Sequence, residues 1–502
     1  MRDVPPLSKQ PTAASDLLWK VAATLRSTMD AADYKSVALP VLYLRFLSSQ
    51  FEQAQRQLDV DGPVRRDFDA LESVRWLPPP ARWETLAQRV RDPETDPVTA
   101  LDEAINALER SHRDLADLFP PVGTLVRGME RRSITDLLAL FEEAADAEAY
   151  DELLAGFAGF EGKGGGEFHT PKSVARLLVE TLQPQQGTVY DPCCGSGGML
   201  VEAVEFMAAR GGDSPTGFAC YGQEVNPRIR QLARMNLDIH GIPADLRCAD
   251  TLERDQWPTL KADFVLANPP LKISDWPRRE ADPRWRYGIP PRTNANFAWL
   301  QHAVDKLGDH GSAGIILANG SLSSKQMGEG DIRKAMVEDD LVACLVALPA
   351  RLFRSSETSA CVWFLTKDKS SQGARGMTDR RGQTLFIDAN AMGEMSGRAH
   401  RVLTDEERTQ IAGVYRAWRG VGSLGEEYRD VPGFCRSAGL DEIRSKRHIL
   451  TPGRYVGGTT EADQLSNDAQ SPEHIRVLAL EFMELLDTYD ELTKEMRRHL
   501  DR

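Results

Sequence analysis

The sequence predicts an α/β protein: a Rossmann-like doubly wound sheet domain, preceded by an all-α N-terminal domain and followed by a helical tail. Between about residues 14 and 150, apolar side chains such as Leu17, Val21 and Leu25 recur at helical spacing, and no clear strand run interrupts them. After a glycine-rich break at 156–166, short apolar runs alternate with helical stretches, which is typical of a doubly wound sheet. The runs are Thr188–Tyr190, Ala219–Gln223, Phe264–Ala267, Gly314–Leu317, Val342–Leu348 and Ala360–Leu365.

We therefore expect a helical domain over 1–155, a sheet domain over 156–457 and a helical tail over 458–502. In the first domain, Pro40 suits the first turn of an apolar helix, and Ser133 or Thr135 suits the N-cap of a later one. The polar stretch 367–383 predicts a surface loop. The tail has an apolar stripe from Ile475 to Leu492 at spacings of three and four residues, typical of a coiled-coil or helix-packing seam.

Composition limits the classes of protein. The 502 residues are 41% hydrophobic, and no stretch approaches the roughly 20 apolar residues that span a bilayer, so we expect no membrane partner. No secretion signal is evident at the N-terminus. Seven cysteines without CxxC spacing argue against a disulfide framework and a zinc site, and indicate the cytoplasm.

The net charge of −14 is unfavourable for a protein that binds DNA alone, because phosphate contacts need Lys and Arg. Two local basic clusters are either solvated faces or phosphate contacts. They consist of Arg278, Arg279, Arg284, Arg286 and Arg292, and of Arg444, Lys446 and Arg447. If DNA is the substrate, we expect a partner to supply much of the positive surface.

The first chemical motif runs from Val189 to Gly198, VYDPCCGSGG. A strand enters a glycine-rich turn, and a helix follows from Met199. Glycine lets the backbone approach a ligand closely, and a helix N-terminus offers free N–H groups. A bare GxGG would be weak support for a nucleotide site, whereas Asp191 at the strand end makes the pattern much narrower.

The second motif is Asn268-Pro269-Pro270-Leu271, at the end of an apolar strand. The prolines fix the backbone, so the side chain and carbonyls there are rigidly placed. An exocyclic amine is a poor nucleophile because its lone pair is delocalised into the ring. The Asn268 side-chain oxygen and the Pro269 carbonyl, both accepting from that amine, would draw it towards a nucleophilic geometry. Alone, such a motif is more often a turn.

Three further positions depend on these two motifs. His169-Thr170-Pro171 precedes the helix Ser173–Leu182 and, taken alone, predicts a helix N-cap with proline in the first turn. Glu224 ends a strand, where an acid can accept from ribose hydroxyls. Asp250 follows Leu246–Ala249 and is suited to accept from an adenine amine. Each acid alone is more often structural, but both stand at successive strand ends.

EFHTP, VYDPCCGSGGM, Glu224 and ANPPLKISDW, in this order, resemble the γ-type amino-methyltransferases. Further stretches resemble the modification subunits of type I restriction-modification systems. They are Leu17–Phe51, Asn294–His302, Gly314–Leu322 and Leu450–Tyr455. This resemblance covers nearly the whole chain and implies a DNA adenine-N6 methyltransferase that uses S-adenosylmethionine, needs no metal and extrudes its target base from the duplex.

The resemblance also assigns residues. Asn268 and Pro269, with Pro270 and Leu271 of the same motif, would act on the target amine. The residues assigned to S-adenosylmethionine are Gly166, Glu167, Phe168, His169, Thr170, Pro171, Asp191, Pro192, Cys193, Gly195, Ser196, Gly197, Gly198, Glu224 and Asp250.

Leu271 departs from the family, which usually has a base-stacking aromatic residue after NPP. Stacking is worth roughly 1–3 kcal/mol per base, so its loss would slow the reaction. Phe353 stands where the family often has a second base-contacting ring, and a core phenylalanine is an equal alternative.

No separate target-recognition domain follows the sheet domain, so the resemblance implies double-stranded DNA bound with a specificity subunit, two modification subunits per specificity subunit, and a restriction subunit for cleavage. One alternative is a catalytically weakened scaffold on DNA, suggested by Leu271. Another is a protein glutamine-N5 methyltransferase, which shares the NPP chemistry but usually has tyrosine after it.

Overall fold

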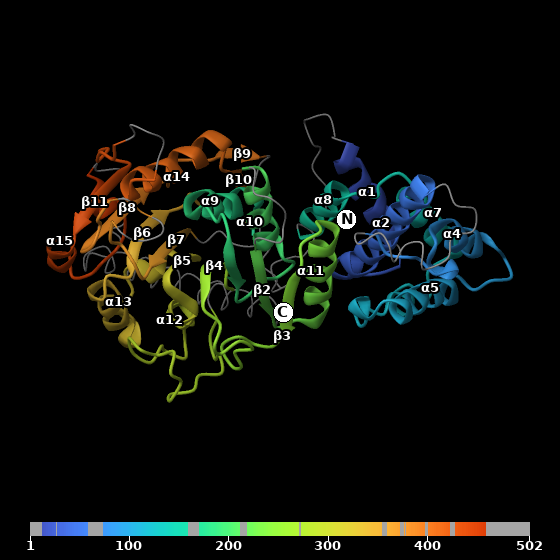
Figure 1. Ribbon diagram of the computed structural model, residues 1–502, viewed down its shortest axis with the longest axis horizontal. Coiled ribbons are helices and arrows are strands. Elements are labelled where there is room, and N and C mark those ends of the chain that lie inside the picture. The colour runs from blue at the N-terminus through green and yellow to red at the C-terminus, as the bar shows by residue number, and fades with distance from the viewer. Residues whose placement is uncertain are drawn as a thin grey trace, which may run out of the picture.

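The computed structural model describes residues 13–26, 28–58, 74–158, 170–210, 218–270, 273–353, 359–371, 376, 378–396, 400–421 and 427–457. They form a helical lobe and an α/β lobe that lie side by side (Figure 1). The predicted apolar stripe of the tail lies outside the described residues. Among the described helices, none has the length and apolar character needed to cross a bilayer.

The helical lobe confirms the prediction of helix for the first part of the chain. Its helices are α1 (Ala13–Leu25), α2 (Tyr34–Leu58), α4 (Trp83–Arg91), α5 (Pro97–Ser111), α6 (Val122–Leu125), α7 (Arg131–Leu140) and α8 (Ala147–Ala158). They enclose one hydrophobic core, in which Val37, Leu42 and Phe141 are fully buried. Amphipathic spacing was therefore a sufficient signal for this lobe.

Two predicted helix starts in this lobe are wrong. The helix α2 begins at Tyr34, so Pro40 lies inside it rather than in its first turn. A short 3₁₀ turn, Ala31–Asp33, leads into this helix and places its start six residues earlier than the proline suggested. The N-cap of α7 is Glu130, and neither Ser133 nor Thr135 caps it.

A nine-stranded sheet forms the centre of the other lobe. Its strands are β1 (Gly187–Asp191), β2 (Phe218–Glu224), β3 (Ala244–Cys248), β4 (Ala262–Ala267), β5 (Leu307–Ala318), β6 (Val342–Ala347), β7 (Ala360–Thr366), β8 (Gln383–Asp388) and β11 (Cys435–Gly439). The order across the sheet is β11-β8-β6-β7-β5-β4-β1-β2-β3. Strands β3, β2, β1, β4 and β5 are parallel, and β7 is antiparallel to both of its neighbours.

All six apolar runs coincide with strands, apart from Leu348, which follows β6, and this confirms the α/β prediction. Strands β8 and β11 and the small hairpin of β9 (Glu394–Ser396) and β10 (His400–Val402) were not predicted. The predicted surface loop 367–383 is partly wrong, because Lys369 is buried and its ammonium donates to the carbonyls of Val342 and Gln383 at 3.1 and 2.7 Å. A buried lysine is accommodated here because it is also paired with Asp340.

Helices cover both faces of the sheet, as a doubly wound fold requires. On one face lie α9 (Lys172–Leu182), α10 (Gly198–Ala208) and α14 (Asp405–Arg419), and on the other α12 (Asn296–Lys306) and α13 (Glu329–Glu338) (Figure 1). Successive strand residues point to opposite faces: Val189 packs with the first set of helices and Tyr190 with the second. Short helices α15 (Leu440–Ser445) and α16 (Gly453–Val456) follow β11.

The helix α11 (Pro227–Ile239) joins the two lobes. Its Ala233 and Leu237 belong to the core of the sheet domain. Its opposite face belongs to the core of the helical lobe, through Ile229, Leu232, Met235 and Ile239. Polar contacts add to this packing, because Tyr43 and Arg75 of the helical lobe both donate to the carboxylate of Asp238, at 2.6–2.8 Å.

Candidate active site at the carboxyl ends of the central strands

The sheet reverses its winding direction at β1, which lies between β2 and β4. Open α/β sheets bind ligands in the crevice outside the carboxyl ends of the strands at such a switch point. Asp191 ends β1, Glu224 ends β2 and Asn268 follows β4 directly. The sheet order therefore brings the chemical motifs of the sequence to one edge.

The glycine turn between β1 and α10 is held from two directions. The N–H of Gly195 donates to the Glu224 carboxylate at 3.1 Å, and the Asn236 side chain of α11 donates to the Ser196 carbonyl at 2.9 Å. Gly195 and Gly197 have φ of 52° and 85°, in the left-handed region that favours glycine. A Cβ at Gly195 or Gly198 would meet no atom within 4 Å, so the backbone here faces open space.

Asp191, the last residue of β1 before this turn, is 2% exposed. Its Oδ1 accepts from the N–H of Cys193 at 3.0 Å. Burial raises the pKa of Asp191 to about 7, and the nearby Glu224 adds to the rise while the Cys193 N–H opposes it. Burial also raises the pKa of Glu224. A buried acid with a raised pKa in a crevice is typical of a binding or catalytic site.

The acid of the third strand is anchored by its own loop. Asp250 is half-buried, and its Oδ1 accepts from the N–H of Leu252 at 2.9 Å and of Glu253 at 3.3 Å. The hydroxyl of Thr251 donates to the Pro192 carbonyl at 2.5 Å. The loop after β3 is thus fastened to the loop after β1.

Asn268 is 7% exposed, and its Nδ2 donates to the hydroxyl of Thr170 at 2.9 Å. The predicted N-cap role of the His169-Thr170-Pro171 segment is therefore corrected: Pro171 is the N-cap of α9, no side chain caps this helix, and Thr170 bonds to Asn268 instead. With its nitrogen engaged, the amide has its oxygen available as an acceptor among the residues that the structure describes. Pro269 is buried and Pro270 half-buried beside it.

The remaining predicted site residues either lie outside the described part of the chain or pack in the core of the sheet domain. Gly166, Glu167, Phe168, His169 and Leu271 lie outside the described residues. Phe353 is 5% exposed and packs in the sheet core with the helices of the first face. Its proposed contact with a base stays a prediction.

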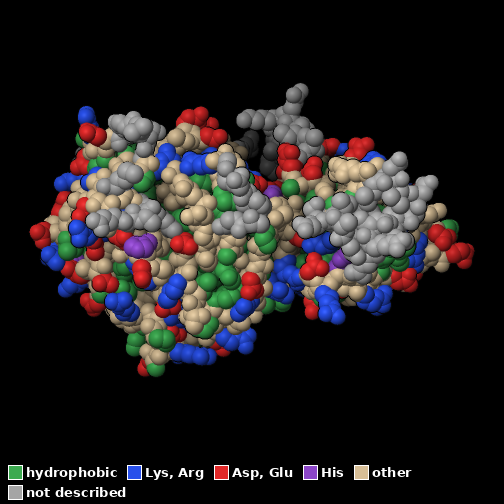
Figure 2. Space-filling model, in the orientation of Figure 1, with side chains coloured by type: hydrophobic (Ala, Val, Ile, Leu, Met, Phe, Trp, Pro, Cys, Tyr) green, Lys and Arg blue, Asp and Glu red, His purple; other side chains and the backbone are tan. Residues whose placement is uncertain are grey.

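The basic cluster after β4 divides into two kinds of residue. Arg279, Arg286 and Arg292 are exposed, and Lys and Arg side chains are visible along the lower edge of the α/β lobe (Figure 2). Arg284, in contrast, is 7% exposed and belongs to the interior of the protein, so it corrects the view of this cluster as one surface patch. In the second cluster, Arg444 is paired with Glu338 and Asp441.

Among the described residues, Asp151, Glu205 and His240 are spaced closely enough to share a metal ion. Both ring nitrogens of His240 instead face carboxylates, of Asp151 at 3.2 Å and Glu205 at 3.4 Å. Although burial lowers it, these two hydrogen bonds raise the pKa of His240 to about 9, and Lys172 adds a further positive charge. We assign the group to ion pairing between α8, α10 and α11.

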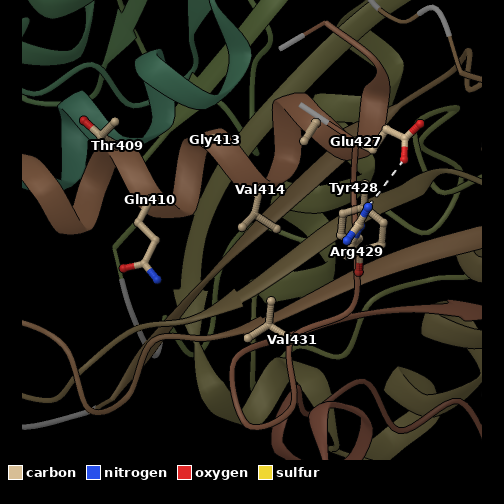
Figure 3. A pocket seen from close by; sticks show the side chains of 9 residues that line it. Thr409, Gln410, Gly413, Val414, Glu427, Tyr428, Arg429 and Val431 are labelled. Carbon is tan, nitrogen blue, oxygen red and sulfur yellow. Dashed lines mark ion pairs between the residues drawn. The ribbon is translucent and has the colours of Figure 1, made fainter. Parts of the chain in front are cut away.

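A groove of about 540 Å³ lies elsewhere, between α14 and the segment before β11 (Figure 3). Thr409, Gln410, Gly413 and Val414 line it from the helix. Its charged residues, Glu427 and Arg429, are more than four-fifths exposed and pair weakly at 3.9 Å. No predicted site residue lines this groove, so the strand ends remain the candidate site.

The site and sheet define a class of protein, a methyltransferase with a doubly wound fold, and comparison with known proteins supports it. Residues 144–464 match the N-6 DNA methylase family, and residues 15–140 match the HsdM N-terminal domain. The type I restriction enzyme HindI methylase subunit of Haemophilus influenzae is 37% identical over 403 residues, which cover 76% of this chain and 87% of that protein. The MjaIX methylase subunit of Methanocaldococcus jannaschii is 32% identical over 521 residues, covering 96% and 90%.

A solved structure supports the same family assignment. The crystal structure of a type I restriction-modification methyltransferase subunit from Streptococcus thermophilus matches with a TM-score of 0.75 and 26% identity, over 89% of this chain and 99% of that one. The chain belongs to the N-6 DNA methylase family, and within it to the modification subunits of type I restriction-modification systems. It is a DNA adenine methyltransferase.

Sequence reasoning missed two contributors to the site. Asn236 of α11, which holds the glycine turn, stands inside an ordinary amphipathic helix and was not singled out. Arg284 was noticed only as one of several basic residues. A polar residue such as Asn236, on the buried side of a helix that follows a motif acid, is the pattern that would have pointed to the first of them.

Proposed function

We propose that this chain transfers a methyl group from S-adenosylmethionine to the N6 amine of an adenine in double-stranded DNA, at a site chosen by a specificity subunit. The observation that carries the proposal is the side-chain contact between Asn268 and Thr170 beside the glycine turn of β1. Because this contact uses the Asn268 nitrogen, the side-chain oxygen of Asn268 remains as an acceptor. The rigid Asn-Pro-Pro backbone holds it at the switch point of the sheet.

The described residues fit the proposed cofactor. Open space faces Gly195 and Gly198, so a ligand has room directly against the turn. Asp191, Glu224 and Asp250 supply carboxylate acceptors at three successive strand ends, which suits the ribose hydroxyls, ammonium and adenine amine of S-adenosylmethionine. Pro192, Cys193, Ser196 and Gly197 complete the turn in this proposal, and Gly166–Pro171 would contribute further contacts to the cofactor.

When bound, S-adenosylmethionine supplies an electrophilic methyl group on a sulfonium. The Asn268 oxygen and the Pro269 carbonyl accept hydrogen bonds from the two protons of the target amine, which withdraws its lone pair from the ring and makes it nucleophilic. Pro270 keeps this backbone rigid. The target adenine must leave the base stack to reach these acceptors, and Leu271 and Phe353 are the proposed contacts of the extruded base.

The domains take separate roles in the proposal. Residues 1–155 contact DNA or the partner, residues 156–457 carry the chemistry in the cytoplasm, and residues 458–502 dock on the specificity subunit. Because the net charge is −14, we expect that subunit to supply much of the phosphate contact. Two copies of this chain per specificity subunit, with a restriction subunit added for cleavage, complete the complex.

Partner dependence is the first test. We expect labelled methyl from S-adenosylmethionine to appear as N6-methyladenine in unmethylated host-type DNA only when this chain is mixed with its specificity subunit. The chain alone should bind the cofactor and transfer little, since its net charge of −14 opposes binding to DNA phosphates. Label with the chain alone would contradict the partner dependence. No label in an assembled complex that binds the cofactor would favour the DNA-bound scaffold, and label on a protein glutamine instead of DNA would favour the glutamine-N5 reading.

Replacing Thr170 by valine should lower kcat about tenfold, the equivalent of one hydrogen bond, because the Asn268 amide then loses the acceptor that fixes its orientation. Thr170→Ser keeps the hydroxyl and should retain most of the rate. Single-turnover methyl transfer in the assembled complex measures both. Equal loss in the serine and valine variants would show that the hydroxyl contact is not what orients Asn268.

A further inference from the structure

Arg284 is a buried cation in the segment between β4 and α12, and all three of its guanidinium nitrogens donate hydrogen bonds. It pairs with Asp282 through Nε at 2.9 Å and Nη2 at 2.6 Å. It also donates to the carbonyls of Thr251 at 2.8 Å and Leu252 at 2.7 Å, and to Nδ1 of His302 at 3.0 Å. The segment that carries Arg284 is the one that leaves the Asn-Pro-Pro motif, while Thr251 and Leu252 follow Asp250.

The contacts of Arg284 continue to both proposed cofactor loops. The N–H of Leu252 donates to the Asp250 carboxylate, and the hydroxyl of Thr251 donates to the Pro192 carbonyl. Arg284 therefore fixes the two residues that orient the acid of β3 and tie its loop to the glycine turn. Trp276, Trp285 and Trp299 pack in the same small cluster as Leu252 and exclude water from these bonds.

The histidine extends the network to the central strand. Arginine has no acceptor, so Nδ1 of His302 accepts and its Nε2 carries the proton, 3.2 Å from the hydroxyl of Tyr190. Burial first, then the charges of Arg284 and Lys306, hold the pKa of His302 well below its ordinary value, so the ring stays neutral. Tyr190 immediately precedes Asp191. The proposed cofactor loops after β1 and β3 are thus within two or three contacts of the Arg284 side chain.

We infer that Arg284 is a positioning residue, which sets the Asp250 loop in the geometry that binds the adenine end of the cofactor and couples it to the segment after Asn268. This inference rests on the proposed function. Lysine cannot replace the planar fork, because an ammonium group provides no fixed pair of parallel donors for Thr251 and Leu252. The charge beside Asp282, in contrast, would survive such a substitution.

The test compares Arg284→Lys with Arg333→Lys in the full chain. Arg333 is 1% exposed and likewise donates to backbone carbonyls, of His448 at 2.7 Å and Ser324 at 2.6 Å, but it touches no cofactor loop. Titration with S-adenosylmethionine by calorimetry should show a dissociation constant raised about tenfold or more in Arg284→Lys. It should be unchanged in Arg333→Lys, although both variants should melt at lower temperature than the native chain.

In the assembled complex, Arg284→Lys should raise the KM for the cofactor and leave kcat at saturation little changed, which a general loss of structure would not do. Unchanged affinity in Arg284→Lys, or equal weakening in Arg333→Lys, would overturn the inference. Asp191→Ala separates this failure from that of the proposed function. If that variant weakens binding and Arg284→Lys does not, only the inference fails, and if Asp191→Ala also binds normally, both fail.

Discussion

Replacing Asn268 by alanine is expected to reduce methyl transfer by about 10²–10³-fold, the usual effect of removing one preorganised group aimed at a transition state. In the proposed mechanism the side-chain oxygen accepts from the target amine, and nothing else among the described residues occupies its place at the end of β4. The cofactor should still bind with nearly native affinity, because the carboxylates and the glycine turn are untouched. Single-turnover transfer and calorimetric titration measure the two quantities separately.

Asn390→Ala is the matched control for this variant. Asn390 is an exposed asparagine after β8, bonded to Asp388 and far from the central strands in the sheet order. It should leave transfer unchanged. A transfer rate within a few-fold of native in Asn268→Ala would remove this residue from the chemistry, and the role of the Asn-Pro-Pro motif would then be structural.

Replacing Asp191 by alanine is expected to raise the dissociation constant of S-adenosylmethionine about 10- to 100-fold, since hydrogen bonds to charged groups contribute about 1.5–3 kcal/mol. The native affinity should also depend on pH. The pKa of Asp191 is about 7, so the site carries a proton below this value, and binding to the carboxylate should strengthen as pH rises through 7.

The stability of the cofactor-free protein should change in the opposite sense. The folded state holds the Asp191 proton between about pH 4 and 7 whereas the unfolded chain releases it, so this residue's contribution to stability falls as pH rises through that window. Calorimetric titration at about pH 6, 7 and 8 and thermal melting between about pH 4 and 7 measure the two trends. Asp191→Asn should remove them, and Asp245→Ala, which changes an exposed acid of β3 paired with Arg247, should retain them. A flat native profile would show that Asp191 does not titrate in the binding reaction.

Much of the fold followed from local patterns. Three of the six apolar runs ended at a motif residue, Asp191, Glu224 or Asn268, and parallel strands place their carboxyl ends at one edge. A correct reading of strand and helix alternation was therefore enough to predict that the motifs meet. Strand β8 was not predicted, because its short buried run, Thr384–Ile387, directly follows a long polar stretch.

The contacts within the site could not be predicted in the same way. The bond between Thr170 and Asn268 joins residues 98 positions apart, and its existence depends on where α9 begins against the sheet. Arg284 looked like its exposed neighbours Arg279 and Arg286, because nothing in the local sequence distinguishes a guanidinium group that turns inward. Side-chain partners are set by tertiary packing, which periodicity does not encode.

The double-faced packing of α11 limits how this protein can be divided or recombined. A fragment that began after α8 would present Ile229, Leu232, Met235 and Ile239 to water as one contiguous apolar strip, the kind of surface that promotes aggregation. An exchange of the helical lobe between relatives would have to preserve the complement of this strip as well as the acceptor at Asp238. The two lobes therefore cannot be separated or exchanged independently, because both pack on the single helix α11.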